Sequence, residues 1–257
     1  VDQLLALLRR SLRLLVENRR ADFCFLRRLA PTRQRELLLR ALDCGELEVE
    51  QGGGLGEVKA RLDELAPEPS ASAAEALSRR IARLRLCVVF DRDSDAQDRS
   101  EPSEASRDLL ARCQALCEGD PWALWAHQLG RRAIENYLPT RLLYDWALRS
   151  PGNWRKRRRE AVDALKRLRE KRPEAAWQYN MKQGLAADIL DGERRKVVRD
   201  QLRGGPKRPD QAARILADDD LDELFKGLDD TDRGALASGF GTVAEEFETK
   251  HLPEEEW

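Results

Sequence analysis

The chain has 257 residues, with 46 Lys and Arg against 47 Asp and Glu, and a formal net charge of -1. This balance excludes a strong overall positive field, so a nucleic-acid interface would have to be a local cluster of basic side chains. No apolar run reaches the roughly 18 residues of a membrane-spanning helix, and no signal peptide opens the chain. The five cysteines include no CxxC pair, which is typical of reduced thiols. We therefore expect a cytoplasmic protein without a membrane segment.

Strands and helices are predicted to alternate over the first 138 residues. Strands are predicted at 12–17, at 46–50, in the first half of 84–95 and at 122–129, from apolar runs or from alternation of polar and apolar residues. Helices are predicted at 2–10, at 22–42 with a break at Pro31, and at 58–65, 74–84, 107–116 and 131–138. After Thr140 the pattern indicates helices alone, separated by breaks at Pro151-Gly152, Pro173 and Gly204-Gly205-Pro206.

This order of elements predicts an α/β fold with a parallel sheet of about four strands flanked by helices, followed by an all-helical C-terminal region. We expect two domains, at 1–148 and 149–257. The Gly-rich stretch at 52–56 lacks the Lys and the Ser or Thr of a phosphate-binding loop, and we interpret it as a turn at a strand end.

Carboxylates follow two of the predicted strands. Glu17 follows the first strand, and Asp91 and Asp93 follow the third, which is apolar enough to be buried on both faces. In a parallel sheet the carboxyl ends of neighbouring strands meet at one edge, where ligands bind. Acids gathered there repel one another unless a cation lies between them. With only two histidines in the chain, oxygen-ligated Mg²⁺ or Mn²⁺ fits better than zinc.

Four segments together resemble a known family of nucleases. They are Leu-Val-Glu at 15–17, Val-Val-Phe-Asp-Arg-Asp at 88–93, Arg-Arg-Ala-Ile-Glu-Asn-Tyr-Leu at 131–138 and Asn-Met-Lys-Gln-Gly at 180–184. The ordered set is similar to the Rossmann-like TOPRIM domain, and in particular to TOPRIM nucleases of the OLD (overcoming lysogenisation defect) type. It is also similar to stand-alone TOPRIM effectors of phage-defence systems, such as the nuclease subunit of the PARIS system. Asn18 follows Glu17 where that family usually has Gly, and the next acid, Asp22, comes one position later than in the family.

The resemblance implies a divalent-metal-dependent endonuclease that cleaves DNA or RNA, with transfer RNA among the candidates. It also implies an effector subunit of an anti-phage defence system, acting beside an ABC-type ATPase. Asp91 and Asp93 would hold the metal, Glu17 would be a ligand or the general base, and Glu135 would serve a second metal shell. Lys182 would stabilise charge on the phosphate in the transition state.

One local cluster of bases is a candidate surface for nucleic acid. Five consecutive cations stand at 155–159, and further bases follow up to 172. Two more cations open the stretch at 131–138 and are candidates for substrate contact. The expected nucleic-acid-binding residues are Arg131, Arg132, Arg155, Lys156, Arg157, Arg158 and Arg159.

Other functions stay open at this point. A haloacid-dehalogenase-like phosphatase also carries Asp-x-Asp at a strand end, but on its first strand, and usually with Thr or Val where this chain has Asp95. An EF-hand is excluded because Ala96 and Pro102 stand where that loop requires Gly and Glu. The main alternative is a non-catalytic subunit of TOPRIM fold that docks to an ATPase. The oligomeric state, including a homo-oligomer, is left open.

Overall fold

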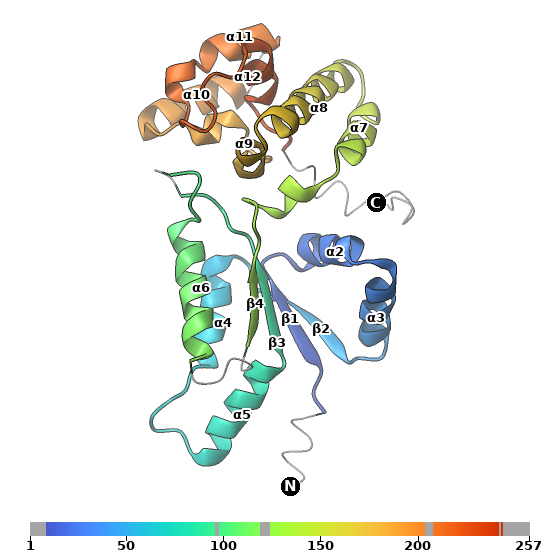
Figure 1. Ribbon diagram of the computed structural model, residues 1–257, viewed down its shortest axis with the longest axis vertical. Coiled ribbons are helices and arrows are strands. Elements are labelled where there is room, and N and C mark those ends of the chain that lie inside the picture. Colours follow the sequence, from blue (N-terminus) through green and yellow to red (C-terminus); the bar gives the residue numbers. More distant parts are fainter. Residues whose placement is uncertain (1–8, 96–97, 119–123, 204–207, 242, 244–257) are drawn as a thin grey trace. The chain divides into compact units, whose positions relative to one another are not determined.

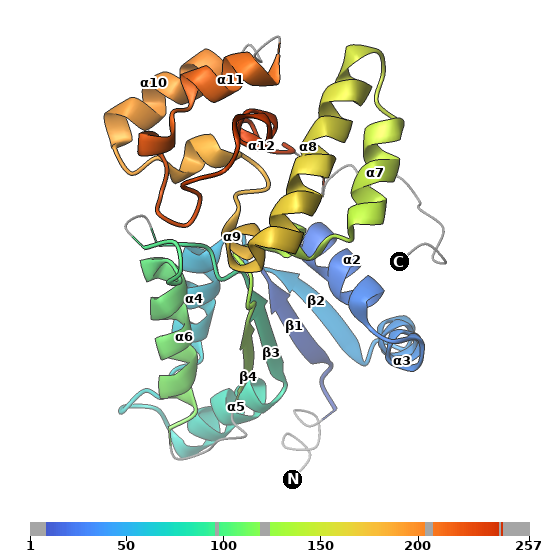
Figure 2. The same ribbon diagram turned by 45° about the horizontal axis from the view of Figure 1, so that its top comes forward.

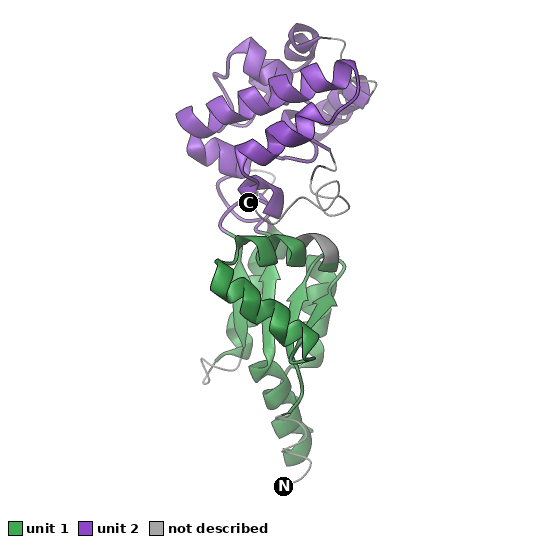
Figure 3. Cartoon of the chain, turned by 90° about the vertical axis from the view of Figure 1, so that its right-hand side faces the viewer, with its two compact units in different colours: residues 1–91, 104–129 green, residues 92–103, 130–257 purple. Residues whose placement is uncertain are grey.

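The computed structural model describes residues 9–95, 98–118, 124–203, 208–241 and 243, apart from the side chains of Arg20 and Ala21. The chain forms two compact units, which Figure 3 shows in different colours. Unit 1 comprises Val1–Asp91 and Glu104–Leu129, and unit 2 comprises Arg92–Ser103 and Gly130–Trp257. A compact unit is not necessarily a domain that folds by itself. The expected domain boundary between 148 and 149 therefore stays a prediction.

Unit 1 contains a four-stranded parallel sheet, which confirms the predicted α/β class. Its strands are β1 (Leu12–Val16), β2 (Leu47–Gln51), β3 (Leu86–Phe90) and β4 (Trp125–Gln128), in the spatial order β2-β1-β3-β4 (Figure 1). The two central strands carry the most apolar runs, because both of their faces are covered. In this register Val16 pairs with Val89, so β1 and β3 end at the same edge of the sheet.

Helices cover both faces of this sheet. They are α2 (Arg19–Leu29), α3 (Thr32–Asp43), α4 (Leu55–Glu64), α5 (Ala73–Leu84) and α6 (Glu104–Leu116). Figure 1 shows α2 and α3 on one face, and α4 with α6 on the other. Leu15, Val88 and Phe90 of the sheet form one buried cluster with Leu62 of α4 and Leu109 of α6. The predicted break at Pro31 is confirmed, since α2 ends before it and α3 begins after it.

Within its described residues, unit 2 contains helices joined by loops and no strand, as expected after Thr140. Its elements are η1 (Ile134–Tyr137), α7 (Thr140–Leu148), α8 (Asn153–Lys171), α9 (Pro173–Gln178), η2 (Leu185–Asp188), α10 (Gly192–Arg203), α11 (Pro209–Ile215), η3 (Asp218–Asp220) and α12 (Asp230–Leu236). Leu165 of α8, Tyr179 and Phe225 are fully buried in its core. Pro173 begins α9, where its missing N–H costs no helical hydrogen bond.

The helix predicted at 131–138 was only partly right, because only Ile134–Tyr137 is helical, and it is a 3-10 turn. The amide of Arg132 donates to the carbonyl of Trp177 at 3.0 Å, and the amide of Arg131 donates to the Tyr137 hydroxyl at 3.1 Å. These longer-range bonds hold 131–133 in a non-helical form, since an α-helix would leave them unmade.

Two further observations bear on the expectations from composition. All five cysteines are free thiols. No helix within the described ranges combines the length and the apolar character that crossing a membrane requires. The predicted helix at 2–10 and the break at Gly204-Gly205-Pro206 fall largely or wholly outside the described residues.

Candidate functional site

The carboxyl ends of β1 and β3 bring two of the predicted site residues together in unit 1. Glu17 directly follows β1 and Asp91 directly follows β3, and these strands are hydrogen-bonded neighbours. The amide of Asp91 donates to Oε1 of Glu17 at 2.9 Å, across 74 positions of sequence. The side chain of Glu17 therefore reaches over the end of the neighbouring strand.

Flanking turns fix both strand ends. The amide of Gly53 donates to the carbonyl of Glu17 at 2.9 Å, so the glycine turn after β2 supports the end of β1. A Cβ atom on Gly52 would lie 2.2 Å from a methyl group of Val58, which explains the need for glycine there. On the other side, the hydroxyl of Ser106 in α6 donates to the carbonyl of Asp91 at 2.8 Å. The backbone that carries the two acids is thus held from both sides.

The other predicted residues gather in unit 2. Asp93 has a positive φ of 50°, a left-handed conformation that Asp adopts more readily than most residues, and its amide donates to the carbonyl of Arg132 at 2.7 Å. Glu135 in η1 is 2% exposed, and its Oε1 lies 3.0 Å from Nζ of Lys182. The second oxygen of Glu135, Oε2, is buried without a hydrogen-bond partner among the described atoms. An unsatisfied buried carboxylate oxygen needs an explanation, and a cation ligand is one.

The pKa of Asp93 reflects this crowded setting. Burial raises the pKa of Asp93 and the charge of Glu135 raises it further, whereas the positive charges of Arg132 and Lys182 lower it. The net shift is upward. Asp93 therefore keeps its proton to a higher pH than a free aspartate does, and a bound divalent cation would displace that proton.

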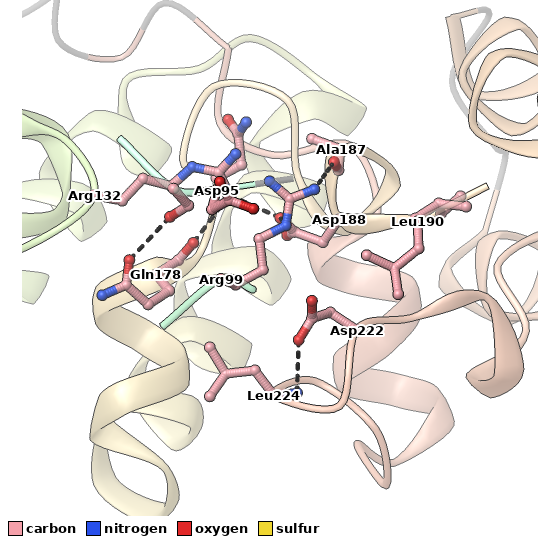
Figure 4. Close-up of polar contacts among 12 residues, drawn as sticks. Asp95, Arg99, Arg132, Gln178, Ala187, Asp188, Leu190, Asp222 and Leu224 are labelled. Atoms are coloured by element: carbon pink, nitrogen blue, oxygen red, sulfur yellow. Dashed lines mark hydrogen bonds and ion pairs between the residues drawn. The ribbon is translucent and has the colours of Figure 1, made fainter. Parts of the chain in front are cut away.

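A buried ion network, which the sequence did not indicate, lies next to this group (Figure 4). Asp188 is fully buried, and its Oδ1 lies 2.7 Å from Nη1 of Arg132 and 3.5 Å from Nε of Arg99. Arg99, 4% exposed, also donates to the carbonyl of Ala187 at 2.9 Å. Burial raises the pKa of Asp188, and the two guanidinium groups oppose that rise.

This network ties the segment after β3 to the interior of unit 2. Arg99 and Asp93 belong to the same segment, 92–103, whose Ser94 side chain hydrogen bonds that of Gln178 at 3.0 Å. Arg132 links the two ends of the arrangement, since its carbonyl accepts from Asp93 while its guanidinium pairs with Asp188. Arg99, Arg132 and Asp188 therefore hold the backbone around Asp93 in place.

The carboxylate oxygens near the ends of β1 and β3 and around Asp93 are ligands that suit a hard divalent cation. Within the described ranges no three His, Cys, Asp or Glu side chains converge on one point. In unit 1 the Glu17 carboxylate reaches the backbone of the acidic residue Asp91, and in unit 2 the charge of Glu135 acts on Asp93. Mg²⁺ usually takes one or two carboxylates and completes its shell with water and substrate phosphate. A pair of carboxylates is therefore enough for this metal.

Some of the predicted basic residues are exposed, and others pack on or hydrogen bond to neighbouring side chains. In α8, Arg155, Lys156 and Arg159 are exposed, whereas Arg158 packs over the ring of Trp146 and donates to the Ser150 hydroxyl at 2.8 Å. The three exposed cations suit contact with a phosphate backbone.

Arg131 and Arg132 have partners inside unit 2. The guanidinium of Arg131 lies 4.5 Å from the ring centre of Tyr137 and donates to the Asn136 carbonyl, and that of Arg132 is 11% exposed on Asp188. Their contact with nucleic acid stays a prediction, and the structure gives both a structural role as well.

Asp22 has a local role at the start of α2. Its Oδ2 accepts the amide of Asn18 at 2.8 Å, which satisfies an N–H near the helix end.

Among the residues that sequence reasoning missed, Asp188 had one feature in the sequence that could have revealed it. It is the single acid in the otherwise apolar run Leu-Ala-Ala-Asp-Ile-Leu at 185–190, where a charge is buried only if it is paired.

Comparison with models of protein families, with curated proteins and with solved structures gave no match to this chain.

Proposed function

We propose that this chain is a divalent-metal-dependent nuclease that hydrolyses phosphodiester bonds of DNA or RNA in the cytoplasm. The observation that carries the proposal is the hydrogen bond between Glu17 and the amide of Asp91. It puts two carboxylate residues from separate strands at one edge of a parallel sheet, the edge at which such sheets bind ligands. The resemblance of these strand ends to those of TOPRIM nucleases supports the same function.

The residues divide the work between them in this proposal. Glu17 and Asp91 hold Mg²⁺ or Mn²⁺, and the pair of Asp93 and Glu135 offers oxygen ligands for a further ion. When bound, the metal neutralises charge on the phosphate and lowers the pKa of an attacking water. Glu17 is also the candidate to accept the proton of that water. Lys182, whose side chain is 61% exposed, supplies positive charge to the phosphate.

The exposed cations of α8 supply the contact with the nucleic-acid backbone in this proposal. Arg155, Lys156 and Arg159 are exposed on one long helix, and Arg155 also donates to the Ser150 carbonyl at 3.3 Å, so the three can follow a row of phosphates. The contact is electrostatic and carries no sequence information. It therefore suits either DNA or RNA.

The biological setting of the proposal rests on resemblance alone. TOPRIM effectors of phage-defence systems act beside an ABC-type ATPase, and we propose the same arrangement for this chain. The partner would control when the nuclease is active.

The decisive experiment compares carboxylate variants in a cleavage assay. The purified chain is incubated with plasmid, single-stranded DNA and total transfer RNA, with Mg²⁺, Mn²⁺ or EDTA, alone and with any neighbouring ATPase. We expect Glu17→Gln and Asp91→Asn to reduce cleavage to the EDTA level. Asp108→Asn is the matched control, since Asp108 is an exposed acid of α6 whose ion pair with Lys59 spans 3.5 Å. It should cut as the parent does.

Two results would overturn the proposal. If Glu17→Gln and Asp91→Asn both cut as fast as the parent, these carboxylates do not hold the metal. If the parent neither cuts any of the three substrates nor binds Mn²⁺ in calorimetry, with or without the ATPase, the chain is better described as a docking subunit.

A further inference from the structure

A pocket in unit 2 combines arginine and tryptophan side chains from α7, from α8, from the end of α10 and from the residue before α11. Its volume is about 520 Å³, within the range of roughly 300–1,000 Å³ typical of small-molecule sites. Its lining comes from α7, α8, the end of α10, the start of α11, α12 and the segment 238–241. The residues that matter below are Trp146, Trp154, Arg157, Arg158, Arg203 and Arg208.

Close packing of the backbone holds the pocket in shape. A Cβ atom on Gly234 of α12 would lie only 2.0 Å from the carbonyl oxygen of Pro209, so α12 packs directly on the start of α11. The same helix also contacts α8 (Figure 2). Trp146, 5% exposed and covered by Arg158 at 3.9 Å, forms a fixed wall. The pocket is therefore largely formed before any ligand binds.

The pocket carries an excess of positive charge. Four arginines line it, against Glu160 as the acid among its lining residues. Within the described part of the chain, neither Arg157 nor Arg208 forms an ion pair with a carboxylate. Arg203 pairs with Asp200 at 3.2 Å, but both side chains are more than half exposed, and such pairs contribute little. A guanidinium group that has no carboxylate partner, or only an exposed one, can bind phosphate through paired N–H donors.

An exposed indole ring lies beside this charge. Trp154 is 57% exposed, although tryptophan is usually largely buried. The guanidinium of Arg157 lies 5.6 Å from its ring centre. Nucleobases stack on exposed aromatic rings of this kind, and neighbouring arginines add a cation–π contribution. An aromatic surface next to a phosphate-binding charge is the chemistry that recognises a nucleotide.

We propose that this pocket binds a nucleotide, with its base on Trp154 and its phosphate between Arg157, Arg203 and Arg208. The nucleotide is either a free one or one unit of a nucleic-acid strand, since both present the same base and phosphate. The pocket shares Arg157 and Arg158 with the basic segment at 155–159. Its occupancy is measured without cleavage, however, so this proposal and the nuclease can fail independently.

Calorimetric titration of the full chain in EDTA tests the proposal with four probes: AMP, ATP, a ten-residue oligothymidylate and inorganic phosphate. We expect Trp154→Ala to weaken binding of the nucleotide probes by about tenfold and to leave phosphate binding unchanged. Arg208→Ala should weaken binding of all the probes that bind. Arg199→Ala, which removes an exposed cation of α10 outside the pocket, should change none of them.

The outcomes separate the two sources and the failure of the idea. Binding of AMP or ATP identifies a free nucleotide, and binding of the oligothymidylate alone identifies a strand; both support the proposal. It is overturned if neither AMP, ATP nor the oligothymidylate binds, even where phosphate does, or if Trp154→Ala binds the nucleotides as tightly as the parent. Because Trp154 is largely exposed, its variant should keep the parent melting temperature, which is measured alongside.

Discussion

Replacing Asp188 by Asn tests whether the buried network of unit 2 is ionic. The substitution keeps the size of the side chain and one acceptor oxygen but removes the negative charge. It leaves Arg99, 4% exposed, and Arg132, with an 11% exposed side chain, without their carboxylate. Removing one partner of a buried ion pair costs roughly 3–5 kcal/mol, because the remaining charge stays in a poorly solvated site.

The expected loss lies at the lower end of that range. Arg99 keeps its hydrogen bond to the Ala187 carbonyl at 2.9 Å, and Arg132 keeps one to the Gln178 carbonyl at 3.0 Å. We therefore expect Asp188→Asn to lower the free energy of unfolding by about 3 kcal/mol, a roughly 150-fold change in the unfolding equilibrium. For a chain of this size the midpoint of thermal unfolding should fall by about 6–12 °C.

Urea denaturation at pH 7, monitored by circular dichroism, measures the loss in the free energy of unfolding. Asp200→Asn is the matched control, since Asp200 pairs with Arg203 at the surface and its loss should cost less than about 1 kcal/mol. The reasoning is refuted if Asp188→Asn is no more destabilising than that control. Such a result would mean that Asp188 holds a proton at neutral pH, because an amide replaces a neutral carboxyl group at little cost.

Three further predictions concern packing, thiol reactivity and charge. Gly184→Ala should cost more than about 2 kcal/mol in urea denaturation, because a Cβ there would meet backbone atoms at 2.2 Å on a φ of +74°; Gly192→Ala, with open space, is its control. Burial raises the pKa of Cys87 to about 12, so about one in ten thousand of its thiols is ionised at pH 8. By mass spectrometry, iodoacetamide should modify exposed Cys44 far faster than Cys87 in the native protein. Reversing the exposed charges of 155–159 should weaken nucleic-acid binding and flatten its dependence on salt.

Each of these has a clear contrary result. Equal stability of the two glycine variants would show that the backbone at 184 can move aside. Equal alkylation rates would show that Cys87 is reached without unfolding. Unchanged binding after charge reversal would exclude the basic segment as a nucleic-acid surface.

The raised pKa of the Cys87 thiol also predicts how its contribution to stability depends on pH. That contribution is intact below about pH 9 and falls as the pH rises toward about 12, since the thiol of the unfolded chain ionises first.

The fold class was predictable because the central strands are unambiguous. The run Leu-Cys-Val-Val-Phe at 86–90 is too apolar for a surface strand and too short for a buried helix. The nearness of Glu17 to Asp91 followed from the same pattern, because parallel neighbours end at one edge. What these two residues do there is still a prediction.

Other features depend on contacts that no local pattern contains. The amide group of Asn136 joins η1 to the carbonyls of Ala176 and Tyr179, and such tertiary bonds explain why 131–138 is not an α-helix. Arg99 stands in a polar loop where an arginine is ordinarily exposed, and only the fold shows that it is buried on Asp188.

The division of the chain has a consequence for folding during synthesis. The chain passes between the two units after residues 91, 103 and 129, so no single cut separates them into complete pieces. Arg99 leaves the ribosome 88 residues before Ala187, its carbonyl partner, which corresponds to a delay of roughly 4 to 18 seconds at ordinary translation rates. During that interval the segment that carries Asp93 lacks its anchor. The group of Asp93, Glu135 and Lys182 can therefore be anchored only after the first half of unit 2 has been made.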